Sequence, residues 1–113
     1  MQEVLQKAEV LADSLKKSST HMQYQLLYQE IKADEALYAR LSDYRRAKFL
    51  LQMQGQGNVF GELEALAREY NDVLSKEVVK NFLSAELRYC RMIRQVKEKI
   101  LSSVEMDLDF LED

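Results

Sequence analysis

Apolar side chains recur at spacings of three and four residues along most of the chain, and this period predicts amphipathic helices. The first apolar stripe contains Val4, Leu5, Ala8, Leu11, Ala12 and Leu15. All three glycines lie between positions 55 and 61 and proline is absent, whereas a β protein would need turn residues spread along its length. The sequence therefore predicts an all-α fold.

Polar residues between the apolar stripes predict where the helices begin. The first stripe is interrupted at positions 18–20, and Thr20 with Gln23 three residues later can form a capping box for a second helix. The N-caps expected for the third, fourth and fifth helices are Asp34, Asn58 and Ser75. The one expected loop lies near residues 52–59. We therefore expect a single domain over residues 1–113, folded as an antiparallel bundle of about five helices.

The last predicted helix is the longest, because no helix breaker follows Ser75. Its apolar stripe continues through Tyr89, Met92, Val96, Ile100, Val104, Leu108 and Leu111. A helix of about 35 residues would span roughly 50 Å, more than the ~30 Å width of a small domain. We therefore interpret these positions as an interface with a second copy, in a homodimer, or with a partner protein. The alternative is a break near Ser102–Ser103 that would fold the tail back.

Composition and charge narrow the class of protein. The chain has 113 residues, of which 47% are hydrophobic, and this apolar share favours a folded domain over a disordered chain. Its net charge is −3, so there is no electrostatic reason to expect nucleic-acid binding. No segment resembles a signal peptide or reaches the roughly 20 apolar residues that cross a membrane. We expect a cytoplasmic protein without direct membrane insertion.

A basic ribbon on the last helix is the one feature that favours RNA. It consists of Arg88, Arg91, Arg94 and Lys97. A spacing of three residues drifts by about 60° per step around a helix, so the ribbon slopes and does not form a flat patch. We interpret it as a solvated face with ion pairs to Glu86 and Glu98, and direct RNA binding through the ribbon is the alternative function.

The residues that carry most enzyme chemistry are sparse. Cys90, the one cysteine, lies one position off the apolar stripe, and we interpret it as a small semi-buried side chain. His21, the one histidine, has no second ligand at zinc spacing and is expected at the surface. Acidic pairs lie two residues apart, on different helix faces. We therefore expect a protein that is not an enzyme and that holds no cofactor or metal.

The C-terminal sequence VEMDLDFLED combines five acids with apolar side chains. Acids at a helix C-terminus oppose the helix dipole, so this end is expected to fray or to pack within a dimer. Short acidic and apolar segments can also dock into a groove on another protein.

Four segments resemble the YlbF/YmcA family of small helical bacterial proteins, and they are distributed along nearly the whole chain, between residues 7 and 100. In chain order they read KAEVLADSLKKS, YQEIKADEALYARLSDYRRAK, LLQMQGQG and VVKNFLSAELRYCRMIRQVKEKI. The second segment has an aromatic side chain, Tyr44, at the position where the family has one. In the last segment, the residues at the family's characteristic positions are Val79, Phe82, Leu83, Ala85 and Glu86.

The resemblance implies a regulatory adaptor that acts by contact with other proteins. Members of the family are implicated in competence, sporulation and biofilm formation in Gram-positive bacteria, and family partners form a complex that associates with the membrane-anchored endoribonuclease Y. A role in RNA processing or developmental regulation, with partners in that complex, is therefore expected. The complex is linked to iron–sulfur clusters, but Cys90 alone cannot supply four thiolates, so a cluster would need ligands from partners. A structural helical dimer without a settled role is a further alternative.

Overall fold

A computed structural model describes residues 1–55 and 57–104, and over these residues the chain is all-α. Six helices follow one another: α1 (Gln2–Lys16), α2 (Ser19–Lys32), α3 (Glu35–Gln54), α4 (Val59–Glu69), α5 (Asn71–Leu74) and α6 (Glu77–Ser103). The all-α prediction is confirmed, and the loop between α3 and α4 falls within the expected residues 52–59. None of the helices described has the length and hydropathy that a membrane crossing requires.

The fourth expected helix is divided into α4 and α5, which is why there are six helices and not five. The backbone leaves the helical conformation at Tyr70, where φ is −103° and ψ is 21°. In an unbroken helix the Glu69 carbonyl would accept from the Val73 N–H, but that N–H donates to the Tyr70 carbonyl at 3.0 Å. Arg40 of α3 donates to the Glu69 carbonyl instead, at 3.1 Å. A residue from another helix therefore stabilises the break.

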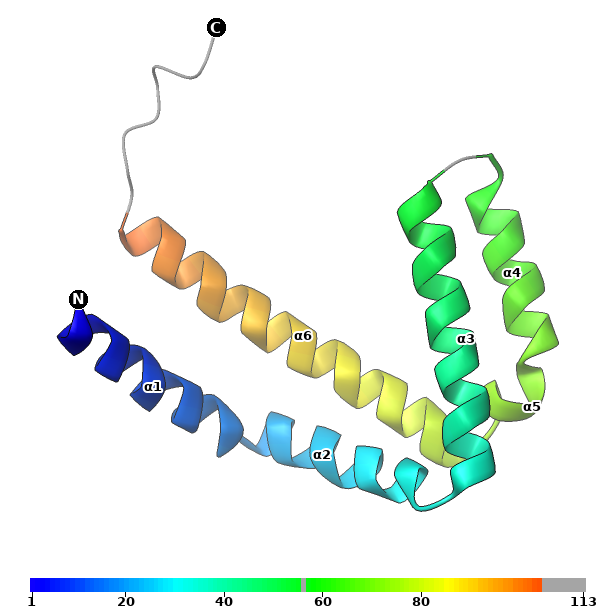
Figure 1. Ribbon diagram of the computed structural model, residues 1–113, viewed down its shortest axis with the longest axis horizontal. Helices are drawn as coiled ribbons and strands as arrows, with labels where there is room; N and C mark the ends of the chain where they lie inside the picture. The colour runs from blue at the N-terminus through cyan, green and yellow to red at the C-terminus, as the bar shows by residue number, and fades with distance from the viewer. Residues whose placement is uncertain (56, 105–113) are drawn as a thin grey trace, which may run out of the picture.

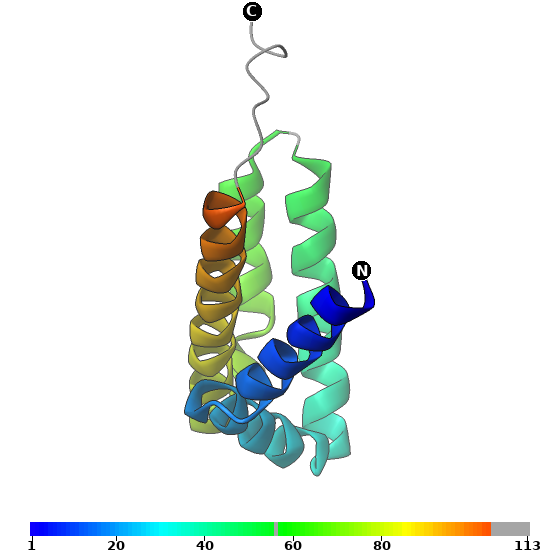
Figure 2. The same cartoon turned by 90° about the vertical axis from the view of Figure 1, so that its left-hand side faces the viewer.

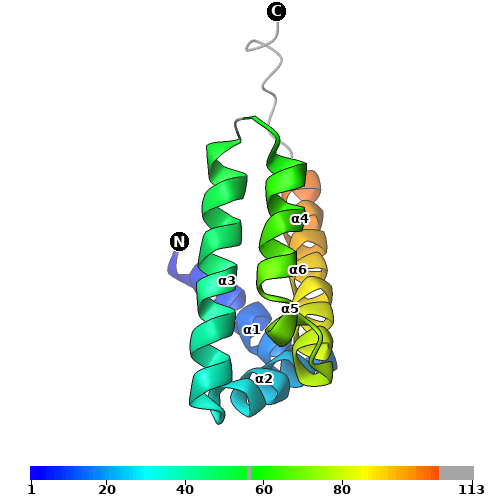
Figure 3. The same cartoon turned by 90° about the vertical axis from the view of Figure 1, so that its right-hand side faces the viewer.

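The helices form two arms that meet at a corner, so the prediction of one bundle is wrong (Figure 1). In the first arm, α2 packs antiparallel on α6, and α1 continues from α2 while diverging from α6. The second arm is the antiparallel hairpin of α3 and α4, which Figure 3 shows side by side. The turn between the arms lies at Asp34, whose extended backbone (φ −102°, ψ 96°) separates α2 from α3. This change of direction could not be derived from helical periodicity.

Two of the expected N-caps are confirmed. The Leu37 N–H donates to Asp34 Oδ1 at 3.2 Å at the start of α3. The Gly61 N–H donates to Asn58 Oδ1 at 3.1 Å at the start of α4. Each bond satisfies an N–H group that has no partner within its own helix.

The other two expected caps are wrong. The N-cap of α2 is Ser18, which accepts from the His21 N–H at 3.2 Å, because the backbone is already extended there and Thr20 lies inside the first turn. Ser75 has a helical backbone and closes α5, so it cannot be the N-cap of α6. That position belongs to Lys76, which has an extended backbone and makes no side-chain cap bond.

The hydrophobic core lies at the corner. The buried apolar residues are Ile31, Leu37, Leu41, Tyr44, Val73, Val79, Phe82 and Ala85. They come from α2, α3, α5 and the first third of α6, where the two arms join. No described residue of α1, or of α6 beyond Ala85, is buried. The far part of each arm therefore has no buried core of its own.

The last helix ends earlier than its apolar stripe predicts. α6 stops at Ser103, and Val104 (φ −112°, ψ 37°) follows it, so an unbroken helix through Val104 is wrong. The Ser102 and Ser103 hydroxyls donate to the Lys99 carbonyl at 3.1 and 2.7 Å, and such bonds compete with the helical backbone. Leu108, Leu111 and the rest of the acidic C-terminal segment lie outside the described residues.

Candidate protein-interaction surfaces

An apolar groove runs between α1 and the second half of α6, and we refer to it as the α1–α6 groove. It has a volume of about 300 Å³ and is lined by Ala8, Leu11, Ala12, Leu15, Ile93, Val96, Lys97, Ile100 and Leu101. Lys97 is the one charged residue among them. Figure 2 shows how α1 and α6 diverge towards their free ends. The two helices therefore leave apolar side chains uncovered along the first arm.

Side chains of the groove are unusually accessible for residues of their type. Leu101 is 59% exposed and Ile100 is 47% exposed. On the α1 side, Leu11 is 37% exposed, and Leu15 is half-buried. Single exposed apolar residues are common on protein surfaces, but a contiguous set along two helices indicates an interaction site.

The structure places the predicted interface residues of α6 in different surroundings. Tyr89 is half-buried against α2, because its ring lies 5.2 Å from the His21 ring and 5.3 Å from the Tyr24 ring. Val96 and Ile100 line the α1–α6 groove and, with Met92 and Leu11, an adjoining hollow of about 370 Å³. Val104 lies beyond the helix and is exposed, and Leu108 and Leu111 are not described.

Helix α1 is the part of this surface that the sequence interpretation missed. The sequence predicts that the far end of α6 overhangs the domain, whereas residues of α1 and α6 line the same groove. The junction of α1 with α2 is fixed by His21, whose Nδ1–H donates to the Lys16 carbonyl at 3.0 Å. His21 is thus half-buried at a helix junction and remains partly accessible at the surface, where it was expected. The available signal was the unmatched apolar stripe of α1 itself.

The basic ribbon is not a single surface. Arg88 donates to Gln23 Oε1 of α2 at 3.1 Å, and Lys97 lines the α1–α6 groove. Arg91 and Arg94 are exposed. The expected ion pairs are wrong, because Glu86 pairs with Arg45 of α3, and no ion pair within residues 1–55 and 57–104 involves Glu98 or the ribbon.

Exposed apolar side chains also occur near the free end of the other arm, and we refer to them together as the hairpin-tip patch. Its members are between 52% and 74% exposed, and they are Phe49, Leu50, Met53 and Phe60. The connection between α3 and α4 begins at Gly55, which ends α3 in the left-handed conformation (φ 56°) that glycine adopts without strain. Below the tip, Phe49 also lines a cavity of about 210 Å³ that extends to Arg45 and Glu86.

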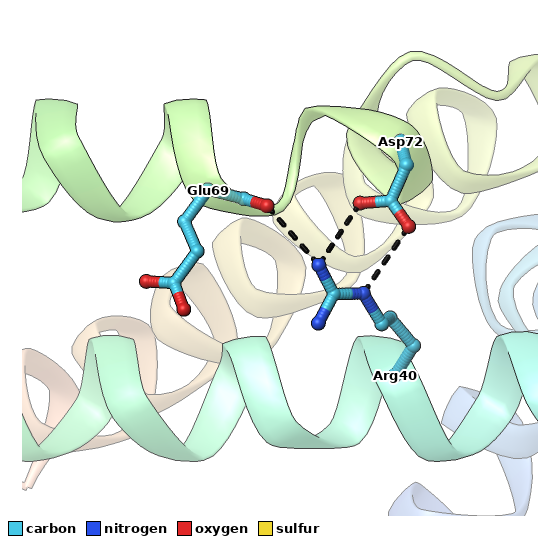
Figure 4. Close-up of polar contacts among 3 residues, drawn as sticks. All are labelled: Arg40, Glu69 and Asp72. Carbon is cyan, nitrogen blue, oxygen red and sulfur yellow. Dashed lines mark hydrogen bonds and ion pairs between the residues drawn. The ribbon is translucent and has the colours of Figure 1, made fainter.

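A clasp centred on Arg40 holds the hairpin arm to the corner (Figure 4). Its guanidinium donates to both carboxylate oxygens of Asp72 at 3.2 Å and to the Glu69 carbonyl at 3.1 Å. It also lies 4.3 Å from the centroid of the Tyr70 ring. The hydrogen bond from Arg40, together with its charge, lowers the pKa of Asp72. The sequence gives no local signal of this clasp, because Arg40 and Asp72 are 32 residues apart.

An aromatic cluster joins α2 to α6 on the other side of the corner. The Tyr24 ring lies 5.4 Å from Phe82 and 6.2 Å from Tyr28. Burial raises the pKa of Tyr24, the Glu86 carboxylate raises it further, and Arg45 opposes both effects. The cluster fixes α2 on α6 and so sets the direction of the first arm.

The structure corrects the interpretation of Cys90, which is exposed on α6 and not semi-buried. Within the part of the chain that the structure describes, no three His, Cys, Asp or Glu side chains are placed to hold a metal ion.

The fold and these surfaces define a small all-α protein. Comparison of its sequence with family models assigns it to one family. Residues 4–105 match the family model described as "Control of competence regulator ComK, YlbF/YmcA", and the chain therefore belongs to the YlbF/YmcA family. This is a regulatory family associated with control of a competence regulator. The resemblance noted in the sequence is thus confirmed.

Similar proteins come from three bacteria and all carry the name UPF0342 protein. The protein from Symbiobacterium thermophilum is 28% identical over 106 residues, which cover 91% of this chain and 95% of the relative. The protein from Caldicellulosiruptor bescii is 25% identical over 108 residues, covering 93% and 91%. The protein from Desulfitobacterium hafniense is 27% identical over 111 residues, covering 93% and 86%. No solved structure matches the chain at a significant level.

Proposed function

We propose that this protein is a non-enzymatic regulatory adaptor that acts by contact with other proteins, in the control of RNA processing or of development in Gram-positive bacteria. The observation that carries the proposal is the hairpin-tip patch, a set of exposed apolar side chains on a different arm from the α1–α6 groove. An adaptor has to engage more than one molecule, and two surfaces on separate arms provide for this.

The composition of the hairpin-tip patch suits a protein partner. Aromatic and methionine side chains are enriched at protein interfaces, and the patch contains Phe49, Phe60 and Met53. Phe60 is 74% exposed, so its burial by a partner would remove a large apolar area from water without disturbing the core. The patch therefore has the chemistry of a contact anchor.

The pathway in the proposal rests on the family. The family is associated with a competence regulator. The resemblance of the chain to the YlbF/YmcA proteins supports partners in the complex that associates with endoribonuclease Y. We therefore propose that the hairpin-tip patch contacts a protein of that complex.

The test is a pull-down of the tagged full chain from a lysate of the native host, read by mass spectrometry. The variant Phe60→Glu places a charge in the patch, and Val10→Glu is its control, because Val10 is 65% exposed on the outer face of α1. We expect endoribonuclease Y or its family partners with the wild type and with Val10→Glu, and their loss with Phe60→Glu. Recovery of none of these proteins with the wild type, or equal recovery with Phe60→Glu, would contradict the proposal.

A further inference from the structure

We propose that the α1–α6 groove is the docking surface for a second copy of this chain, and that α1 and α6 of the two copies form a four-helix contact. The proposal goes beyond the adaptor function, which concerns the hairpin-tip patch on the other arm. It also assigns the contact to two helices, whereas the apolar stripe of α6 alone would assign it to one.

The first argument is that α1 lacks the packing that a helix of its length requires. Helices of about 15 residues are marginal in water, and most of their stability in proteins comes from packing an apolar face. α1 has 15 residues and none of them is buried. Its stripe of Ala8, Leu11, Ala12 and Leu15 lines the α1–α6 groove on one side only, and the groove remains open. A second pair of helices in the groove would cover this stripe.

The second argument is the accessible area. The chain exposes 9100 Å², whereas a compact monomer of its mass would expose about 6,400 Å². Even if the ten residues outside the described part were assigned the full area of an extended chain, about 1,700 Å², roughly 1,400 Å² of excess would remain over a compact monomer of the rest. A standard interface buries about 800 Å² on each partner. The excess area of the chain as a whole therefore exceeds what one partner buries in a standard interface.

The third argument is charge, and it favours a second copy over another apolar partner. The second half of α6 carries four cations and one acid, and its cations are Arg91, Arg94, Lys97 and Lys99. α1 carries three acids and two bases, and its acids are Glu3, Glu9 and Asp13. In a two-fold dimer, α1 of one copy can lie against α6 of the other, and the excess charges on the two helices then have opposite sign. The same chain supplies both halves of this complementarity.

The experiment is sedimentation velocity of the purified full chain at tens of micromolar. We expect the wild type to sediment as a dimer of twice the 13.2 kDa chain mass. Ala12→Arg places a charge in the groove, and a buried unpaired charge should raise the dimer dissociation constant by about tenfold or more. The matched control on the same helix is Val10→Arg, on the outer face, which should leave the dimer unchanged.

A second pair of variants tests the α6 side. Leu101→Arg lies in the α1–α6 groove and should also dissociate the dimer, whereas Leu87→Arg, on the outer face of α6, should not. All four positions are exposed in the monomer, so each variant should keep its helical circular dichroism. If one groove variant fails to fold, the other decides the result.

Three outcomes would overturn the proposal. A wild-type chain that stays monomeric at about 100 µM would exclude a specific dimer of this size. A dimer that tolerates both Ala12→Arg and Leu101→Arg would have its interface elsewhere. Equal dissociation by groove and outer-face variants would mean that the effect is not specific. Because this assay contains no partner protein, its failure is distinct from a failure of the pull-down with Phe60→Glu.

Discussion

Phe82 is the residue whose truncation tests most directly whether the corner holds the fold together. Its side chain is 1% exposed, and its ring lies 5.4 Å from that of Tyr24 and 6.0 Å from that of Tyr28. The guanidinium of Arg45 lies 5.3 Å from its centroid. Phe82→Ala therefore removes the central member of a packed cluster and leaves a cavity between α2, α3 and α6.

The expected loss for Phe82→Ala is about 3–5 kcal/mol of unfolding free energy, as for other buried phenylalanines. Domains of this size have a total stability of about 5–15 kcal/mol, so the loss is a large part of the whole. The assay is urea unfolding followed by circular dichroism at 222 nm, at one protein concentration for all variants so that self-association does not enter the comparison.

The control is Leu87→Ala, which truncates a 52% exposed side chain on the outer face of the same helix. Its cost should stay within about 0.5 kcal/mol. A loss below about 1 kcal/mol for Phe82→Ala, or equal losses for the two variants, would refute the view that buried packing at the corner dominates the stability of this chain.

Three further predictions concern the ends of helices and the clasp. Asp34→Ala should cost about 1 kcal/mol in urea unfolding, because it removes the cap bond to the Leu37 N–H. Gly55→Ala should cost about 1–2 kcal/mol in the same assay, because a Cβ strains the left-handed backbone although no atom blocks it, and Gly55→Asn should cost less. Arg40 lowers the pKa of Asp72, so this pair stabilises the fold above the unfolded-state pKa of the carboxyl and ceases to do so as pH falls through the folded-state pKa. Wild type should therefore exceed Asp72→Asn in melting temperature at neutral pH, and the difference should vanish in strong acid; a difference that persists there would contradict this.

The elements that depend on neighbouring residues could be predicted from the sequence. The spacing of apolar residues located the helices, and the side chains of Asp34 and Asn58 lie in place to cap the helices that follow them. The break at Tyr70 could not be predicted, because the group that stabilises it belongs to Arg40, on another helix. When the end of a helix is stabilised by a residue that is distant in the sequence, the neighbouring residues do not indicate where the helix ends.

For the candidate surfaces, too, the sequence could predict some residues and not others. The stripe on α6 pointed to Val96 and Ile100, which do line the α1–α6 groove. Periodicity assigned Tyr89 to the same stripe, although the bend between α1 and α2 at Ser18 brings α2 against it. Periodicity describes which face of a helix is apolar, but the fold decides which helix covers each part of that face.

The corner also sets the distance between the free ends of the two arms. α3 is 20 residues long and α6 is 27, so the arms extend about 30 and 40 Å from the point where they meet. Molecules held at the two free ends are thus kept apart by a spacer whose angle depends on the Asp34 turn and on packing around Phe82. A substitution at the corner can therefore change the geometry of a larger assembly without altering any residue that touches another molecule.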